Sequence, residues 1–236
     1  MSKNSSDQIK HSHAYKADFE YKHKNPYHEK LVEFSDFVLL DTDPEKLRGT
    51  WSDKVFANKN LLCAEIGTGF GSFMLEYVKL NPEHNFIGLD YRFKRSYQLA
   101  KKLAAIPQRN FRYLRAKGER LEFLFAPKEL DRIFYFFPDP WPKSRHHKKR
   151  LFQEPFLEAS YQALKPGGEL WIKTDHVGYF EWMRREIVKF KKFDIKLISY
   201  NIHEDFPDHL MAKITTKFEK IFIKQKIPSK AIVLTR

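Results

Sequence analysis

The sequence predicts an α/β fold: a doubly wound, mostly parallel sheet with an antiparallel strand at one edge. From residue 60 onward, short apolar runs alternate with amphipathic stretches, which is typical of βαβ units. A chain of 236 residues can bury a core without disulfides, and its one cysteine, Cys63, excludes a disulfide framework. No apolar run approaches the roughly 20 residues of a membrane span. We therefore expect a soluble, cytoplasmic domain over residues 26–236.

Five apolar runs are expected to form strands, and four amphipathic stretches are expected to form helices. The predicted strands are Leu61–Ile66, Asn85–Leu89, Phe111–Leu114, Arg132–Phe137 and Glu169–Thr174. The predicted helices are Ser72–Leu80, Lys94–Ile106, Pro155–Leu164 and Tyr179–Phe190. A Lys-Pro-Gly-Gly turn at residues 165–168 separates the third helix from the fifth strand. The runs Ile195–Ile202 and Phe218–Gln225 are interpreted as strands at one edge, and residues 25–41 as a short helix or extended segment.

The first 25 residues are polar and show no sustained apolar period, so residues 1–25 are interpreted as a flexible basic arm. His11, His13 and His23 are spaced too irregularly to favour a metal site there. His146 and His147 also lack companions at metal-ligand spacing, so no metal is expected.

The chain is strongly basic, with 43 Lys and Arg against 30 Asp and Glu and a net charge of +13. A positive excess of this size attracts polyanions, and nucleic acid is the favoured partner. The alternative is a solvated basic surface that aids solubility. Net charge alone does not distinguish RNA, DNA and an anionic membrane.

A glycine turn, Glu-Ile-Gly-Thr-Gly-Phe-Gly, begins at Glu65 where the first strand ends. Gly67, Gly69 and Gly71 let the backbone turn sharply and let a ligand approach it, although a purely structural turn is the alternative. The Glu65 carboxylate suits a cationic ligand better than a pyrophosphate, and S-adenosylmethionine carries a sulfonium and an ammonium. Asp90 ends the second strand, where an acid commonly binds ribose hydroxyls or, alternatively, caps the next helix.

The fourth strand runs into a proline loop, Phe-Pro-Asp-Pro-Trp-Pro-Lys at residues 137–143. Three prolines in five residues fix φ and remove backbone donors, so the segment is predicted to be a stiff loop. Asp139 can accept hydrogen bonds from a nucleobase, and Trp141 can stack on it for roughly 1–3 kcal/mol. A structural turn with a packed tryptophan is the alternative. The cations that follow are predicted to contact RNA phosphates rather than form a solvated face: Arg145, Lys148, Lys149 and Arg150.

Together these residues resemble the bacterial type of the tRNA (guanine-N7-)-methyltransferase family, over about residues 61–219. The most specific shared element is the proline loop with the basic run that follows it. Next come residues 164–175 and the Thr-Lys-Phe-Glu segment at 216–219. The resemblance implies a Rossmann-like class I methyltransferase that transfers a methyl group from S-adenosylmethionine to N7 of a guanosine in the tRNA variable loop (position 46). It would act on tRNA as a monomer or homodimer, without a metal or a membrane.

The resemblance also implies roles for single residues. Glu65 and Asp90 would bind the cofactor together with the glycine turn, and Asp139 would be the catalytic residue at the junction of cofactor and substrate. Lys117 stands where the family usually has an acid near the adenine. The implied substrate contacts are Lys143, Asp175, Thr216, Lys217, Phe218 and Glu219.

Guanine N7 has an exposed lone pair, so its methylation requires positioning rather than deprotonation. Asp139 is therefore expected to orient the base and stabilise its developing charge. One alternative function is an adenine-N6 nucleic-acid methyltransferase, because the Pro-Asp-Pro-Trp sequence resembles the Asp-Pro-Pro-Tyr/Trp loop of that class. Another is a non-catalytic RNA-binding protein whose cofactor site is degenerate, as marked by Lys117.

Overall fold

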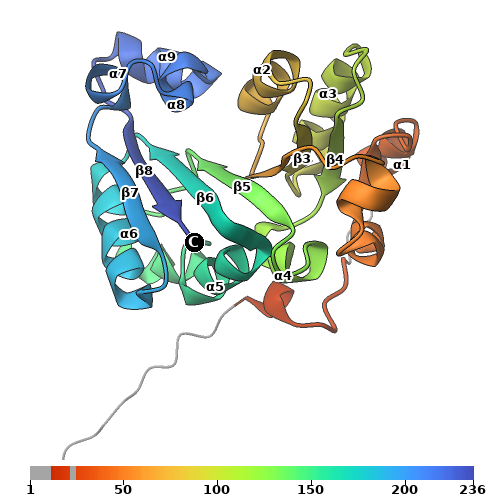
Figure 1. Ribbon diagram of the computed structural model, residues 1–236, viewed down its shortest axis with the longest axis horizontal. Helices are drawn as coiled ribbons and strands as arrows, with labels where there is room; N and C mark the ends of the chain where they lie inside the picture. Colours follow the sequence, from red (N-terminus) through yellow and green to blue (C-terminus); the bar gives the residue numbers. More distant parts are fainter. Residues whose placement is uncertain (1–11, 22–24) are drawn as a thin grey trace, which may run out of the picture.

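The computed structural model describes residues 12–21 and 25–236 of the chain. These residues contain an eight-stranded sheet (Figure 1). Its strand order is β1-β4-β3-β2-β5-β6-β8-β7. The pairings from β1 to β6 are parallel, and β8 is antiparallel to both β6 and β7. This confirms the predicted fold class, including antiparallel pairing near one edge. The strands are β1 Val38–Leu40, β2 Leu62–Ile66, β3 Asn85–Leu89, β4 Phe111–Arg115, β5 Leu130–Phe136, β6 Leu164–Thr174, β7 Asp194–Ser199 and β8 Lys230–Thr235.

Helices cover both faces of the sheet because neighbouring strand residues point to opposite sides. Phe134 of β5 packs in the same core cluster as Leu99 of α3, whereas Ile133 packs in the cluster that holds Phe180 of α6. The helices are α1 Pro26–Val32, α2 Ser72–Leu80, α3 Phe93–Ala104, α4 Leu121–Leu124, α5 Glu154–Ala163, α6 Val177–Phe190, α7 Ile202–Asp205, α8 Leu210–Lys213 and α9 Lys217–Lys224. The 3-10 and π-helical turns are η1 His13–Tyr15, η2 Asp43–Leu47, η3 Trp51–Val55, η4 Gly118–Arg120 and η5 Ser144–Lys149.

Helix α9 occupies the run in which we predicted a strand, so that prediction was wrong. The Thr216 hydroxyl accepts a hydrogen bond from the Glu219 amide, and the Glu219 carboxylate accepts one from the Thr216 amide, each at 3.1 Å. This reciprocal capping box starts a helix and outweighs the β propensity of the apolar residues that follow. Strand β8, which was not predicted, takes the place beside β6. The predicted strand Ile195–Ile202 is shorter as well, since β7 ends at Ser199.

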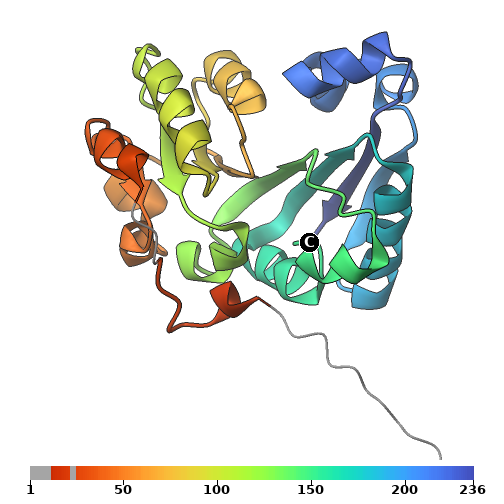
Figure 2. The same ribbon diagram turned by 180° about the vertical axis from the view of Figure 1, so that it is seen from behind.

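The described part of the N-terminal segment, residues 12–21, lies against the domain near η4 (Figure 2, red). The Arg120 guanidinium donates hydrogen bonds to the carbonyls of Ala14 at 3.0 Å and Lys16 at 2.5 Å. The hydroxyl of Tyr21 accepts one from the Lys117 amide at 2.9 Å. His11 and His23 lie outside the described residues, and the flexibility of the arm stays a prediction.

Two further observations concern residues 12–21 and 25–236 alone. None of their helices is long and apolar enough to cross a lipid bilayer. No group of three or more His, Cys, Asp and Glu side chains among them is arranged to hold a metal ion.

Candidate active site

A cavity of about 250 Å³ opens at the carboxyl ends of β2, β3, β4 and β5. This is the crevice in which open α/β sheets bind their ligands. Its walls come from the glycine turn, the residues after β3 and β4, and the proline loop after β5. Six residues singled out in the sequence line it: Gly67, Asp90, Lys117, Asp139, Trp141 and Lys149. The fold therefore brings three of the six predicted cofactor residues and the predicted catalytic residue to one cavity.

The glycine turn after β2 has a backbone that requires glycine. Gly67, Gly69 and Gly71 have φ values of 83°, 57° and 75°, in the left-handed region that side chains disfavour. The Gly67 amide donates to the carbonyl of Leu89 at 2.8 Å, which ties the turn to β3. A Cβ on Gly71 would lie 2.1 Å from a methyl carbon of Leu99. The turn is thus tightly packed against α3 and adjoins the cavity through Gly67.

Asp90 connects the glycine turn to the start of α3. One of its carboxylate oxygens accepts a hydrogen bond from the Gly69 amide at 3.0 Å, and the other accepts one from the Arg92 amide at 2.9 Å. Burial raises the pKa of Asp90, and these two hydrogen bonds oppose that rise. The carboxylate therefore orders the backbone at the cavity edge, and its contact with a ribose stays a prediction.

Glu65 is buried in β2 and immediately precedes Ile66 and Gly67, which line the cavity. Its side chain is 4% exposed, and among the described residues its Oε2 atom has no hydrogen-bond partner. Burial raises the pKa of Glu65 to about 8; Asp90 adds to the rise and Lys173 opposes it. A buried carboxyl oxygen without a donor is costly unless a ligand completes it. This environment suits a ligand that carries a positive charge.

The backbone of the proline loop is strained at two positions. Phe137 and Trp141 have φ values of 48° and 43°, which residues other than glycine rarely adopt. The Phe137 amide donates to the carbonyl of Lys173 in β6 at 2.8 Å. The Arg150 guanidinium donates to the carbonyl of Pro140 at 2.9 Å. Such strain persists only where the surrounding structure imposes it, and it concentrates at functional sites.

Asp139 and Trp141, which both belong to this loop, differ in their exposure to solvent. Asp139 is exposed and lines the cavity. Trp141 is half-buried, with the Lys149 ammonium 4.6 Å from its ring centroid and the His146 ring edge-on at 5.8 Å. The indole thus already makes a cation–π contact at the cavity wall.

The basic run after the loop divides into exposed and buried cations. Arg145, Lys148 and Lys149 are exposed on η5, as is Lys143 just before it. Arg150 is 4% exposed, and its guanidinium lies 4.8 Å and 4.9 Å from the ring centroids of Tyr179 and Trp182. Its predicted RNA contact stays untested, and its burial makes it the least accessible of the four predicted phosphate-binding cations.

Lys117 lies in the cavity among aromatic rings that the sequence analysis missed. Its ammonium is 5.1 Å from the ring centroid of Phe19 and 5.8 Å from that of Tyr91. The Lys117 amide donates a hydrogen bond to the hydroxyl of Tyr21, which is 96 residues away in the sequence. Tyr91 follows Asp90 directly, so its position at a strand end was a usable signal. No sequence signal indicates the contact with the N-terminal segment.

None of the six implied substrate residues lines this cavity. Asp175 follows the end of β6, the neighbour of β5, and Thr216 caps the N-terminus of α9. Glu219 is fully buried, and its carboxylate binds the Lys173 ammonium at 2.7 Å and 2.9 Å and the His203 ring at 3.0 Å. The exposed residues of this segment are Lys217 and Phe218. Substrate contact by all of these residues stays a prediction.

Comparisons with known proteins agree with this geometry. Residues 59–231 match the model of a family described as putative methyltransferases. The tRNA (guanine-N(7)-)-methyltransferase of Enterococcus faecalis is 36% identical over 191 residues, which cover 80% of this chain and 87% of that protein. The protein of the same name from Oenococcus oeni is 34% identical over 213 residues, which cover 84% of this chain and 91% of that protein.

Two solved structures share the fold. The 16S rRNA methyltransferase KamB has a TM-score of 0.55 and 16% identity, covering 75% of this chain and 87% of that chain. A structure described as an antibiotic-related methyltransferase has a TM-score of 0.54 and 14% identity, covering 92% of this chain and 96% of that chain. At these identities the likeness concerns the fold alone.

Proposed function

Because this chain belongs to the tRNA (guanine-N7-)-methyltransferase family, we propose that it transfers a methyl group from S-adenosylmethionine to N7 of a guanosine in the tRNA variable loop. The observation that carries this proposal is that Gly67 and Asp90 line the same cavity as Asp139. A cofactor held by the first two residues would lie beside a base held by the third. Residues 26–236 would form the catalytic domain, which would act on tRNA in the cytoplasm.

The residues around the glycine turn fit S-adenosylmethionine. The buried Oε2 atom of Glu65 lacks a donor among the described residues, and the ammonium of the cofactor would supply one. Asp90 lies at the strand end from which an acid commonly binds ribose hydroxyls. When bound, the cofactor supplies a methyl group on a positively charged sulfur. Glu65 and Asp90 would then hold the cofactor and balance its charge.

Asp139 would act by positioning and by charge. Guanine N7 needs no deprotonation before it attacks a methyl group, so the barrier depends on how well the base is oriented. Preorganisation of this kind supplies roughly 7–11 kcal/mol. Methylation leaves positive charge on the ring, and a carboxylate that accepts hydrogen bonds from N1–H and the exocyclic amine would stabilise it. The strained loop, fixed at Phe137 and Pro140, keeps Asp139 in place.

The exposed cations of η5 would hold the RNA backbone beside the cavity. Lys149 lines the cavity itself, while Arg145 and Lys148 are exposed on the same turn. Phosphate contacts position a nucleic acid without reading its sequence, so these residues would orient the tRNA rather than select the guanosine.

The test is to incubate the purified protein with an unmodified tRNA transcript and methyl-labelled S-adenosylmethionine. After digestion to nucleosides, we expect the label in 7-methylguanosine, and mapping of the intact tRNA should place it in the variable loop. Label in N6-methyladenosine would instead identify an adenine methyltransferase. Binding of tRNA without any transfer of label would identify a non-catalytic RNA-binding protein.

A further inference from the structure

A second groove, of about 320 Å³, separates α2 and the end of α3 from α8 and α9. In Figure 1, α9 and α2 face each other at the top of the molecule, where the parallel strands end. One wall comes from Phe70 of the glycine turn and from residues of α2, and the other comes from residues 213–220. The groove therefore begins at the same turn that borders the candidate active site.

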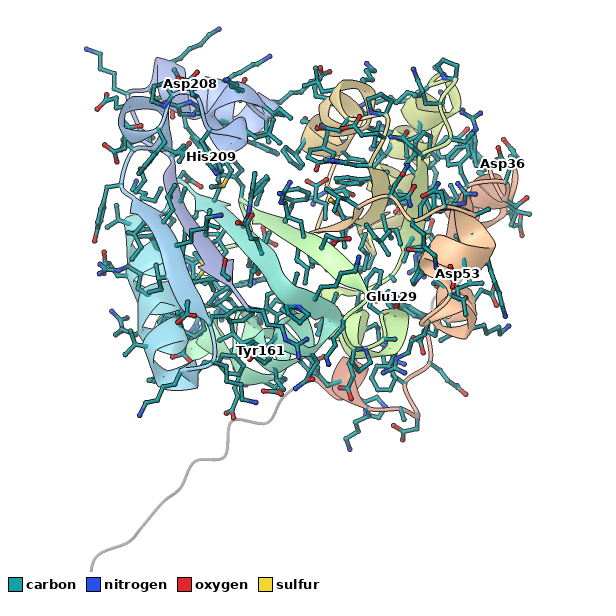
Figure 3. The ribbon with its side chains drawn as sticks, viewed as in Figure 1. Asp36, Asp53, Glu129, Tyr161, Asp208 and His209 are labelled. Atoms are coloured by element: carbon teal, nitrogen blue, oxygen red, sulfur yellow. The ribbon has the colours of Figure 1, made fainter. Side chains whose placement is uncertain are left out.

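The lining of this groove is strongly basic. Its only carboxylate among the lining residues is Glu76, against four lysines: Lys102, Lys213, Lys217 and Lys220. Within residues 12–21 and 25–236, neither Lys217 nor Lys220 has a carboxylate partner within ion-pair distance. Lys213 pairs with Asp208 at 3.2 Å, but the side chains are 56% and 100% exposed. Figure 3 shows Asp208 by the helices α7, α8 and α9 at the top of the molecule. An exposed pair of this kind contributes little.

Like charges from separate elements approach each other across the groove. Lys102 comes from α3, and Lys217 begins α9. The pKa of the Lys102 ammonium is lowered, first by partial burial and then by the charge of Lys217. The Lys102 ammonium also donates to the carbonyl of Phe70 at 3.1 Å, which fixes it at the groove wall. An anion between the two ammonium groups would relieve their repulsion.

An aromatic ring lies among these cations. Phe70 is 38% exposed, and the Arg95 guanidinium and Lys102 ammonium lie 5.8 Å and 6.0 Å from its ring centroid. A basic groove with an accessible aromatic ring is the arrangement that binds single-stranded nucleic acid, because phosphates meet the cations and a base meets the ring. The concave shape suits a strand better than the flat surface of a membrane.

The groove is also connected to the loop that carries Asp139. The ring of Phe222 in α9 lies 6.0 Å from that of Phe137, the first residue of the proline loop. We propose that this groove binds the phosphodiester backbone of the tRNA strand next to the target nucleotide, an inference that rests on the proposed function. The strand would leave the active site between α2 and α9, on a different side from the η5 cations.

The test compares two double variants that remove the same charge from the same helices. Lys102→Gln/Lys220→Gln removes two lysines of the groove, and Lys101→Gln/Lys224→Gln removes exposed lysines of α3 and α9 outside it. We expect the groove variant to raise the Kd for tRNA about tenfold, on the order of threefold for each phosphate contact, and to reduce the salt slope by about 2. The control variant should bind tRNA within about twofold of the wild type.

Thermal unfolding and binding of S-adenosylmethionine show whether both variants are folded. If the two variants bind tRNA equally well, the groove proposal is overturned, whereas formation of 7-methylguanosine by the wild type would leave the proposed function intact. A selective loss of tRNA affinity without any 7-methylguanosine from the wild type would support the groove and overturn the proposed function. Loss of binding to phosphatidylserine vesicles with unchanged tRNA binding would assign the groove to a membrane and overturn the proposal.

Discussion

Because the Glu65 carboxyl is buried, its protonation makes the stability of the folded protein depend on pH. Its pKa is about 8 in the folded protein, against an ordinary value of 4.5, because burial disfavours the charged form. The folded protein therefore binds a proton that the unfolded chain releases between these pH values. The contribution of Glu65 to the free energy of unfolding is complete below about pH 4.5 and declines as the pH rises to about 8.

This shift predicts how cofactor affinity depends on pH. A cation favours the ionised carboxylate, so its binding must release the proton below about pH 8. We expect the affinity for S-adenosylmethionine to rise between pH 6 and 7.5, by at most about tenfold per pH unit. Calorimetry in buffers of different ionisation enthalpy would measure both the affinity and the released proton.

Glu65→Gln serves as the control, because glutamine keeps the size of the side chain and cannot titrate. In this variant the affinity should be lower at pH 7.5 and nearly independent of pH. An equally steep pH dependence in the variant would mean that another group, such as Asp90, controls binding.

A second prediction at this scale concerns Asp139. Asp139→Asn keeps the shape of the side chain but removes its charge, so stabilisation of the methylated ring is lost. We expect kcat to fall roughly 100-fold, as when one electrostatic group is removed from an active site. The affinity for tRNA should stay within about twofold, because phosphate contacts are unchanged. Single-turnover rates would measure the loss directly, and wild-type turnover by Asp139→Asn would contradict the assigned role.

At the scale of elements, β6 and α9 are joined by an ion pair in the interior. Lys173 at the end of β6 and Glu219 in α9 are both fully buried, and the Lys173 ammonium also donates to the carbonyl of Met211 at 2.8 Å. Removing Lys173 would leave the buried Glu219 carboxylate with the His203 ring at 3.0 Å but without its ammonium partner, which is costly in the interior. We expect Lys173→Met to lower the free energy of unfolding by about 3–5 kcal/mol in urea titrations.

Two comparisons make this prediction specific. The double variant Lys173→Met/Glu219→Gln should recover part of the loss, since glutamine leaves no buried charge and keeps the capping contacts of α9. Lys192→Met removes a cation whose pair with Glu158 is exposed, and it should change the unfolding free energy by less than about 1 kcal/mol. Equal effects of Lys173→Met and Lys192→Met would refute a special role for the buried pair.

The elements also show what could be predicted from the sequence. β3 and α2 have the predicted bounds because their apolar periods are clear and their ends are marked by turn residues. α9 was mistaken for a strand because Ile221, Phe222 and Ile223 are consecutive apolar residues, although the Thr-x-x-Glu capping signal precedes them. Local pattern alone did not reveal that β8 inserts between β6 and β7, since that pairing depends on residues far apart in the chain.

Some residues of the candidate site could likewise be predicted from the sequence, and others could not. Gly67, Asp90 and Asp139 could be predicted because strand ends of a parallel sheet meet at one edge. The hydrogen bond between Tyr21 and Lys117 could not, because it joins segments that no sequence motif relates. Arg150 lies in a run of cations that looks solvated throughout, and only the packing of α6 shows that its guanidinium is buried.

At the scale of the whole molecule, two groups of exposed cations lie near the candidate site of a chain whose net charge is +13. One group of exposed cations lies on η5 beside the cavity, and another lines the groove between α3 and α9. A tRNA that places one nucleotide against Asp139 and follows the proposed path through the groove would pass both groups. The two surfaces should therefore act on one bound molecule, and each should contribute its own share of the salt dependence.

This arrangement predicts that the two surfaces contribute additively. Arg145→Gln/Lys148→Gln on η5 should weaken tRNA binding about tenfold, as expected for Lys102→Gln/Lys220→Gln in the groove. Because the two pairs lie on separate elements, the variant that combines all four changes should bind about 100-fold more weakly than the wild type. The slope of log Kd against log salt concentration should fall by the sum of the two separate changes. If tRNA uses only one of the two surfaces, one double variant should bind like the wild type, and the combined variant should bind like the other double variant. In that case, the tRNA strand would cross the carboxyl edge of the sheet on the side of that one surface alone.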